Sequence, residues 1–170
     1  MKRVISLLVI TLVMIAAKGS KAQEVVNSIG VRFGHGGISY KYIEDYYRGF
    51  ETILAFRDNG IQFIGLIQAY KPIKTDRISN LYLYYGAGGH AGYKGIERTY
   101  ARQGVNGCEI YTDTRFNPVL GADGIVGAEY HFYSIPLAMS LDYKPFIEFF
   151  SENMVRVDLW DFGFTLRYTF

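Results

Sequence analysis

The last eleven residues, 160–170, read Trp-Asp-Phe-Gly-Phe-Thr-Leu-Arg-Tyr-Thr-Phe. Large apolar residues occupy every even position from Trp160 to Phe170, and small, polar or charged residues occupy the odd positions between them. A period of two is typical of a β-strand whose two faces meet different environments. About eleven residues are also enough for a tilted strand to cross a bilayer. This stretch therefore predicts a strand that can span a membrane.

Two upstream segments, 118–132 and 136–149, repeat the alternation. In the second segment one face is apolar and the other is polar or charged. The apolar positions are Leu137, Met139, Leu141, Tyr143, Ile147 and Phe149, and the other face holds Ala138, Ser140, Asp142, Lys144 and Glu148. Alternation alone leaves a soluble sandwich or a lipocalin-like barrel open, because such folds bury the apolar face.

The first 22 residues have the pattern of a secretory signal peptide. Lys2 and Arg3 precede an uncharged apolar run over 4–17, and Ser20 and Ala22 provide small residues at the −3 and −1 positions of a cleavage site. The run is shorter than the roughly 20 residues that a membrane-spanning helix needs, which argues against an anchor. We expect cleavage after Ala22 and one mature domain, residues 23–170.

The export signal, the strand lengths and the aromatic residues together favour a membrane barrel. Aromatic residues concentrate near the expected strand ends, as interfacial girdles require. They are Tyr40, Tyr42, Tyr46, Tyr47, Tyr70, Tyr130, Tyr133, Tyr143, Tyr168 and Phe170. We therefore predict an all-β fold, an eight-stranded antiparallel up-and-down transmembrane β-barrel in the bacterial outer membrane.

The eight expected strands are 28–43, 49–57, 61–71, 79–87, 89–96, 118–132, 136–149 and 158–170. In the first of them the apolar face changes from odd to even positions, which we assign to a β-bulge at Gly36-Gly37. The alternative is a hairpin loop at residues 35–37, which would add a ninth strand. Tight turns are expected at 58–60, where Asn-Gly is a hairpin signal, and at 86–89.

The connections at 58–60, 86–89 and 133–136 are short, and an even strand number places them on the periplasmic side with both termini. The charged segment 97–117 then becomes a long outer connection. It contains Cys108, the only cysteine, which excludes a disulfide framework. We expect a free thiol there, and an intermolecular disulfide is the alternative.

Charged residues on the inward face balance in number. The inward cations are Arg32, Lys41, Arg57, Lys94, Lys144 and Arg167, and the inward anions are Glu51, Asp123, Glu129, Asp142, Glu148 and Asp161. An eight-stranded barrel leaves room only for side chains, so these groups are expected to pair and to plug the lumen. The alternative, a diffusion pore, would need more strands or an excess of one charge.

No catalytic, cofactor or metal motif is present, and we expect a non-enzymatic protein without a cofactor. His35, His90 and His131 are the candidate bases for acyl transfer, with Ser39, Ser134 or Ser140 as the nucleophile, but their spacing matches no known motif. We expect His131 in the interior network and His90 beside a turn.

The chain has 18 Lys and Arg against 16 Asp and Glu, and without the four cations of the signal the mature charge is 14 − 16 = −2. Nucleic-acid binding therefore has no electrostatic basis.

The mature chain resembles small eight-stranded outer-membrane barrels of the outer-membrane protein X and A type, and most closely the uncharacterised outer-membrane barrels of Bacteroidota, which are Gram-negative. The segments that carry the resemblance are 29–34, 37–42, 84–90, 124–130, 135–137 and 166–170. Phe170 resembles the signal that the barrel-assembly machinery reads, although Thr165 stands where that signal often has Gly.

The resemblance implies outer-membrane lipid, lipopolysaccharide and the assembly machinery as partners. It also implies a monomer that acts as an envelope scaffold or a surface-interaction protein through its outer loops. A lipid-modifying enzyme and a narrow transporter of small hydrophobic molecules are the alternatives.

Overall fold

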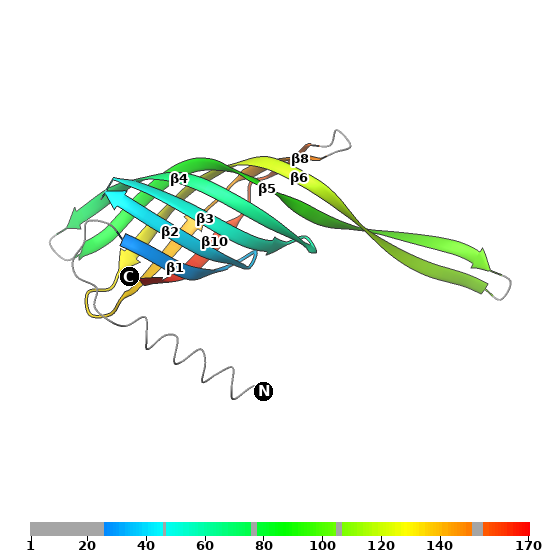
Figure 1. Ribbon diagram of the computed structural model, residues 1–170, viewed down its shortest axis with the longest axis horizontal. Coiled ribbons are helices and arrows are strands. Elements are labelled where there is room, and N and C mark those ends of the chain that lie inside the picture. The colour runs from blue at the N-terminus through cyan, green and yellow to red at the C-terminus, as the bar shows by residue number, and fades with distance from the viewer. Residues whose placement is uncertain (1–25, 46, 76–77, 105–106, 151–154) are drawn as a thin grey trace, which may run out of the picture.

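The computed structural model describes residues 26–45, 47–75, 78–104, 107–150 and 155–170. These residues form a closed antiparallel β-barrel (Figure 1). Its strands are β1 (Val26–Phe33), β2 (Gly37–Asp45), β3 (Arg48–Arg57), β4 (Gly60–Thr75), β5 (Ile78–Gly104), β6 (Gly107–His131), β7 (Leu137–Tyr143), β8 (Phe146–Phe150), β9 (Val155–Asp158) and β10 (Phe162–Thr169). In this part of the chain no helix has the length and hydropathy to cross a bilayer. The expected signal peptide, 1–22, lies outside the described residues.

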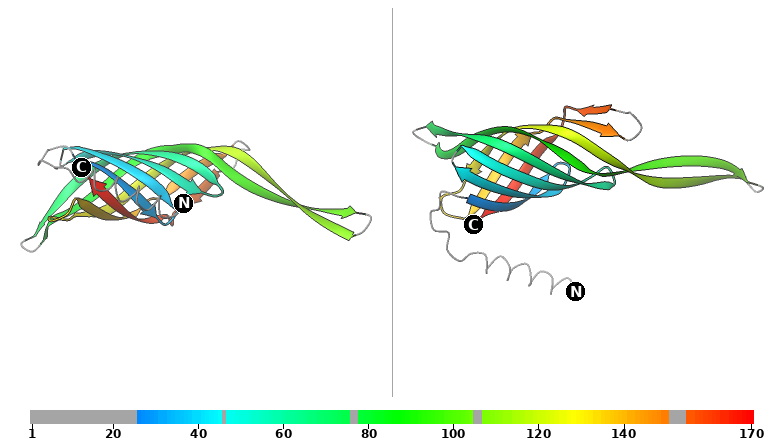
Figure 2. Two further views of the ribbon diagram at one scale, coloured as in Figure 1. Left: turned by 60° about the horizontal axis from the view of Figure 1, so that its bottom comes forward. Right: turned by 45° about the horizontal axis from the view of Figure 1, so that its top comes forward.

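Eight strands form the barrel wall, although the chain has ten strand segments. β1 pairs with β2 and β10, and β5 pairs with β4 and β6, so the sheet closes on itself (Figure 2). β7 and β8 both pair with β6, and the break between them contains Pro145, which has no N–H to donate. β10 pairs with β7, and β9 pairs with β8. β7 and β8 therefore form one interrupted wall strand, and β9 and β10 form the next one. The predicted fold class, an eight-stranded antiparallel up-and-down barrel, is confirmed.

The predicted bulge at Gly36-Gly37 is wrong, and the hairpin alternative is the correct reading. Residues 34–36 form a loop in which Gly34 and Gly36 have φ of 112° and 66°, a region that favours glycine. β1 and β2 then pair with each other, with Val31 opposite Ile38. The apolar face changes from odd to even positions because the chain reverses direction.

The predicted turn at 86–89 is also wrong. β5 runs through these glycines without interruption, with Gly88 opposite Leu66 on β4 and opposite Asp123 on β6. The predicted number of eight strands is still correct because the two errors cancel. The predicted strand 28–43 is two strands, and the predicted strands 79–87 and 89–96 are one strand.

Segment 97–117, expected to be a loop, continues β5 and β6 as a two-stranded ribbon whose last pair is Gly104 and Gly107. Cys108 lies opposite Gln103 in this ribbon, and its thiol is outside the described side chains.

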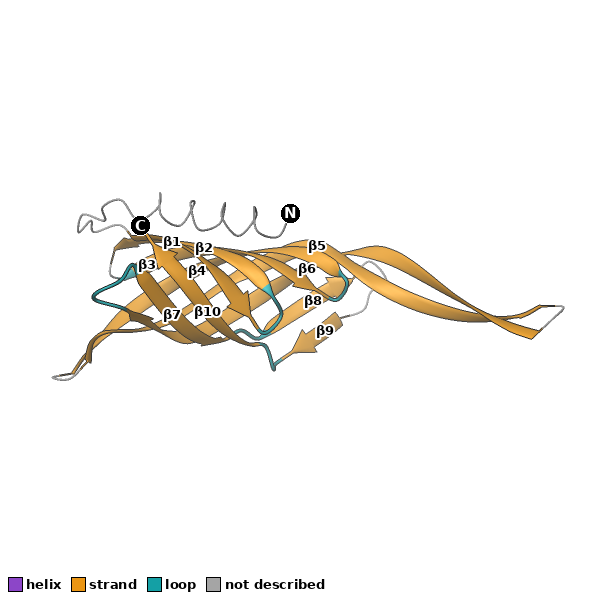
Figure 3. Cartoon of the chain, turned by 90° about the horizontal axis from the view of Figure 1, so that it is seen from below, coloured by secondary structure: helices purple, strands orange, loops and turns teal. Residues whose placement is uncertain are grey.

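The barrel has two unlike ends. Phe170 exchanges backbone hydrogen bonds with Asn27 (3.3 and 2.8 Å), so the end of the chain lies beside the start of β1, at what we call the terminal end. The ribbon projects from the opposite end, the hairpin end (Figures 1 and 3). The Asp58-Asn59 turn lies at the hairpin end, so its predicted placement on the same side as the termini is wrong. Both residues have φ of 53°, as a two-residue hairpin turn with positive φ at both positions requires.

Large apolar side chains cover the outside of the wall and charged ones fill the inside. Ile67, Tyr85 and Leu141 are 71%, 63% and 65% exposed, whereas Arg167, Lys41 and Glu51 are fully buried. The interior also has an apolar part that the alternation did not reveal. It comprises Ile43, Ile53, Ala55, Ile64, Leu66, Tyr70, Tyr84 and Ile125. Tyr70, expected in an interfacial girdle, therefore points inward.

Candidate functional site

The lumen is filled by ion pairs, and its charged residues are those that the alternation predicted. Of the twelve predicted inward charges, all but the half-buried Lys94 are buried. Successive inward residues on each strand are two positions apart, and eight strands surround a narrow interior, so charges from distant segments meet. The predicted plugged lumen agrees with this packing.

Arg167 on β10 is at the centre of the cluster nearer the terminal end. Its guanidinium bonds Glu51 on β3, lies 3.3 Å from Glu129 on β6, and donates to Ser140 on β7 at 2.6 Å. Lys41 on β2 lies 2.7 Å from Glu129 and 3.5 Å from Glu51. Two cations thus share two carboxylates, which offsets much of the cost of removing four charges from water.

Two tyrosines pack against Lys41 of this cluster, and one of them also reaches the cluster nearer the hairpin end. Lys41 Nζ lies 4.3 Å from the ring centroid of Tyr84, and the Tyr70 and Tyr84 rings stack at 5.5 Å. The Tyr84 hydroxyl donates to Asp142 at 3.2 Å, and Asp142 also bonds Arg32. The polar network is therefore continuous along the lumen.

The second cluster joins the hairpin-end halves of the strands. Lys144 lies 2.9 Å from Asp123 and 3.0 Å from Asp161, and Arg57 donates to Glu148 at 2.6 Å. Four buried side-chain atoms of the described residues lack a hydrogen-bond partner, and three of them are here. They are Arg57 Nε, His90 Nε2 and Glu148 Oε2, and the fourth is Thr165 Oγ1.

Asp58 forms ion pairs with two strands at the hairpin end of the barrel. Its Oδ2 lies 3.0 Å from Lys94 Nζ on β5 and 3.0 Å from Arg156 NH1 on β9. Partial burial by itself would raise the pKa of Asp58, but Lys94, Arg156 and Arg57 lower that pKa below its usual value. Arg156 also contacts Asp158 at 3.2 Å. These pairs link the β3–β4 turn to the neighbouring strand β5 and, across the hairpin end, to β9.

Each of the three histidines faces a carboxylate. His131 Nε2 lies 2.7 Å from Glu129, so the expectation of an interior position is correct. His90 lies in the middle of β5, 2.6 Å from Asp123, and the expectation that it flanks a turn is wrong because that turn does not exist. His35, in the β1–β2 loop, lies 3.0 Å from Asp161.

Two of the three candidate serines, Ser39 and Ser140, have partners in the ion-pair network. Ser39 donates to Glu51 at 2.6 Å, Ser140 accepts from Arg167, and Ser134 is exposed in the β6–β7 connection. No group of three or more metal-ligating side chains occurs among the residues that the structure describes.

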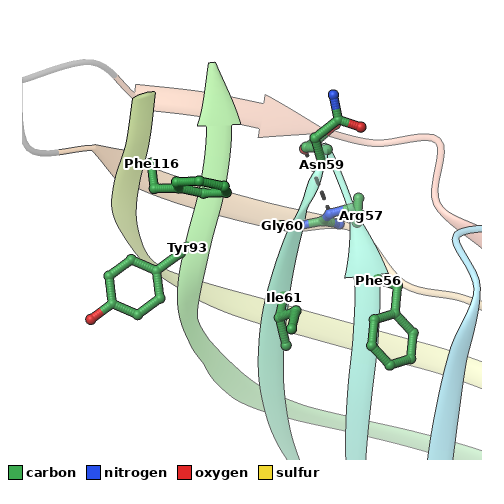
Figure 4. Close-up of a pocket in the computed structure, with 8 residues that line it drawn as sticks. Phe56, Arg57, Asn59, Gly60, Ile61, Tyr93 and Phe116 are labelled. Atoms are coloured by element: carbon green, nitrogen blue, oxygen red, sulfur yellow. Dashed lines mark ion pairs between the residues drawn. The ribbon is translucent and has the colours of Figure 1, made fainter. Parts of the chain in front are cut away.

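An apolar groove of about 680 Å³ lies on the outside of the wall at the hairpin end. Phe56, Ile61, Tyr93 and Phe116 line it next to the Asp58-Asn59 turn (Figure 4). Phe56, Ile61 and Tyr93 are each at least half exposed, so the groove belongs to the apolar exterior and not to the lumen.

Sequence comparisons do not assign a family. No known family model matches the chain, and no curated protein matches it. The barrel architecture, the filled lumen and the apolar exterior are therefore the basis for a functional conclusion.

Proposed function

We propose that this chain is an integral outer-membrane β-barrel protein that acts as a scaffold and presents the β5–β6 ribbon at the cell surface. The observation that carries the proposal is the inverted distribution of side chains. Large apolar residues such as Leu141 and Ile67 are exposed on the outer wall, whereas most of the charged residues of the barrel wall are buried. In water a protein with this outer surface would not remain a monomer, because exposed apolar patches of such extent promote association.

Features at both ends support this location. The residues 1–22 have the composition of an export signal. β10 pairs with β1 and closes the barrel, and the segment from Phe164 to Phe170 resembles the one that the barrel-assembly machinery reads. We propose outer-membrane lipid and lipopolysaccharide as the surroundings of the apolar wall, a monomeric barrel, and the outer-membrane protein X and A type as the class it resembles.

The ribbon supports a role in surface interaction. β4 ends its pairing with β5 at Tyr93, and β8 ends its pairing with β6 at Val119. Beyond these points β5 and β6 pair only with each other and project from the barrel (Figure 2). Long extracellular loops and short periplasmic turns are usual in outer-membrane barrels, so the ribbon is proposed to face outward. The filled lumen supports a non-conducting role, and we propose that the protein is not an enzyme.

Fractionation of cells that express the full chain tests the location. We expect the protein in the outer-membrane fraction, resistant to extraction by urea, with a mature N-terminus at Gln23 by mass spectrometry. Recovery as a urea-extractable soluble protein would contradict the proposal.

The scaffold role has its own test. Deletion of the gene should leave the lipid A mass unchanged, and the purified barrel should give no single-channel steps in planar bilayers. A lipid A mass shift that His131→Ala also produces would favour the enzyme, and regular conductance steps would favour the transporter.

A further inference from the structure

His90 lies inside the barrel between two carboxylates that come from different strands. Its Nδ1 is 2.6 Å from Asp123 Oδ2 on β6, and its Nε2 is 3.5 Å from Glu148 Oε1 on β8. The imidazole has no exposed surface, and its ring packs edge-on against Phe146 with 5.7 Å between centroids. Both ring nitrogens therefore face oxygen acceptors.

The protonated ring fits this arrangement better than the neutral one. A neutral imidazole has one donor and one acceptor nitrogen, whereas the imidazolium has two donors. In the neutral form one nitrogen would direct its lone pair toward an ionised carboxylate. His90 Nε2 has no hydrogen-bond partner, and Glu148 Oε1 lies 3.5 Å from it. A small movement of the protonated ring toward Glu148 would therefore satisfy a buried nitrogen that is otherwise costly.

The charges around His90 balance only when one histidine is protonated. The hairpin-end cluster has five Lys and Arg residues against six Asp and Glu residues. They are Arg32, Arg57, Lys94, Lys144 and Arg156 against Asp58, Asp123, Asp142, Glu148, Asp158 and Asp161. His35 also pairs with Asp161, but its side chain is 39% exposed, and solvent screens its charge. His90 is the buried candidate for the sixth cation.

All elements that pack around the site contribute charged or polar groups. Arg57 of β3 lies 2.6 Å from Glu148, and Gln62 of β4 donates to Glu148 at 3.2 Å. Lys94 of β5 and Arg156 of β9 lie 3.7 and 3.9 Å from Glu148 Oε2, and Lys144 lies 2.9 Å from Asp123. Glu148 thus keeps cationic neighbours in either state of His90, but Asp123 and Glu148 share a donor only through the protonated ring.

The fold leaves room for this side chain. Gly121 of β6 is opposite His90 in the strand register, and a Cβ at Gly121 would collide with the imidazole. The position of the ring is therefore determined by a glycine on the next strand as well as by its two carboxylate partners.

We propose that His90 is a proton sensor in the lumen and that its protonation holds the hairpin end of the barrel together. When protonated, it donates to Asp123 and Glu148 and joins β5 to β6 and β8. When it loses the proton, Glu148 loses that donor, and the cluster below the Asp58–Arg156 pair loosens. The stability that the imidazolium provides is present at acidic pH and is lost as the pH rises through the titration of His90 in the folded barrel.

Melting of the full-length mature protein in detergent micelles tests this sensor. The gel shift between folded and heat-denatured forms gives the melting midpoint between about pH 5 and pH 9, a range that brackets histidine titration. We expect the wild-type midpoint to fall as the pH rises, and the His90→Gln curve to lose that slope. His35→Gln and His131→Gln are the matched controls and should keep it. A wild-type midpoint without a slope, or an unchanged slope in His90→Gln, would overturn the proposal.

A second measurement does not depend on whether His90→Gln folds. Imidazole nitrogen NMR of the ¹⁵N-histidine-labelled wild type, assigned with the two control variants, should show both His90 nitrogens protonated at pH 7. A single neutral tautomer at pH 7 would exclude the sensor while leaving the proposed membrane location and scaffold role intact.

Discussion

Arg167, on the last strand, bonds Glu51, on β3, across the lumen, although the two residues are 116 positions apart in the chain. The same guanidinium also reaches Glu129 at 3.3 Å, Ser140 at 2.6 Å and Ser39 at 3.3 Å, so one side chain of β10 contacts four other strands. Arg167 and Glu51 have no exposed surface. A buried charge that loses its partner cannot be solvated by water, and leaving it unpaired is costly. The stability of the barrel therefore depends on this contact with its last strand.

Removal of the Arg167 charge should destabilise the barrel. Arg167→Met leaves Glu51 and Glu129 with Lys41 as their shared cation, and we expect a loss of about 3–5 kcal/mol in unfolding free energy. Urea unfolding of the micelle-bound protein, followed by tryptophan fluorescence, measures this loss. Lys71→Met, at an exposed position of β4, is the control and should change stability by less than about 0.5 kcal/mol. Equal effects of the two variants would contradict the ion-pair plug.

A charge on the outer wall distinguishes a bilayer from water. Leu141 is 65% exposed on β7, and Leu141→Arg should cost about 2–4 kcal/mol if that surface faces the centre of a bilayer. Tyr133→Arg, at an 84% exposed site in the β6–β7 connection, should cost little. Folding yields into lipid vesicles at increasing urea give both values. A soluble barrel would tolerate the two substitutions equally.

Glycines that face the lumen should not tolerate a methyl group. A Cβ at Gly127 would collide with the Leu141 carbonyl oxygen and the Tyr84 ring, so Gly127→Ala should cost about 1–3 kcal/mol by overpacking. Gly65 faces outward, and a Cβ there would have the tip of the Phe50 ring as its nearest neighbour, at 4.0 Å, so Gly65→Ala is the matched control. Melting midpoints should fall for the first variant only. A drop of the same size in both would mean that strand propensity, and not the space inside the barrel, is responsible.

The ion pairs of Asp58 with Lys94 and Arg156 should weaken in acid. The pKa of Asp58 lies below the ordinary value of 3.8 because Lys94, Arg156 and Arg57 outweigh its partial burial. The stability that the carboxylate provides is therefore complete above about pH 4 and is lost as the pH falls through the lowered pKa. Hydrogen exchange should show faster exchange of the Gly95 amide, which donates to the Asp58 carbonyl at 3.1 Å, in Asp58→Asn than in the wild type near neutral pH. Equal exchange in the two proteins would mean that the carboxylate does not hold this turn.

Much of the barrel was predictable because side-chain alternation is a local property. The positions of Arg32, Asp142 and Glu148 on the inner face follow from a period of two, which no tertiary contact alters. The β1–β2 hairpin was missed because a bulge and a reversal produce the same change of phase. The false turn at Gly86 to Gly89 has another cause: these glycines let neighbouring strands approach closely, and composition does not separate that role from a turn.

The candidate site was predictable in membership but not in pairing. Six cations and six anions were expected to pair inside, yet the residues that meet depend on strand order and stagger around a closed sheet. His90 illustrates this limit, since its two carboxylate partners lie 33 residues away at Asp123 and on β8 at Glu148. Their approach requires the β5–β6 register and the space at Gly121.

The sequence by itself determined which residues face outward and which face inward, because apolar and polar residues alternate along each strand and successive side chains point to opposite faces. The tertiary structure alone decided which strands are neighbours, which end carries the ribbon, and which inward charges form ion pairs with one another. Those properties depend on closure of the sheet, which brings together residues more than a hundred positions apart, such as Arg32 and Asp142, 110 positions apart.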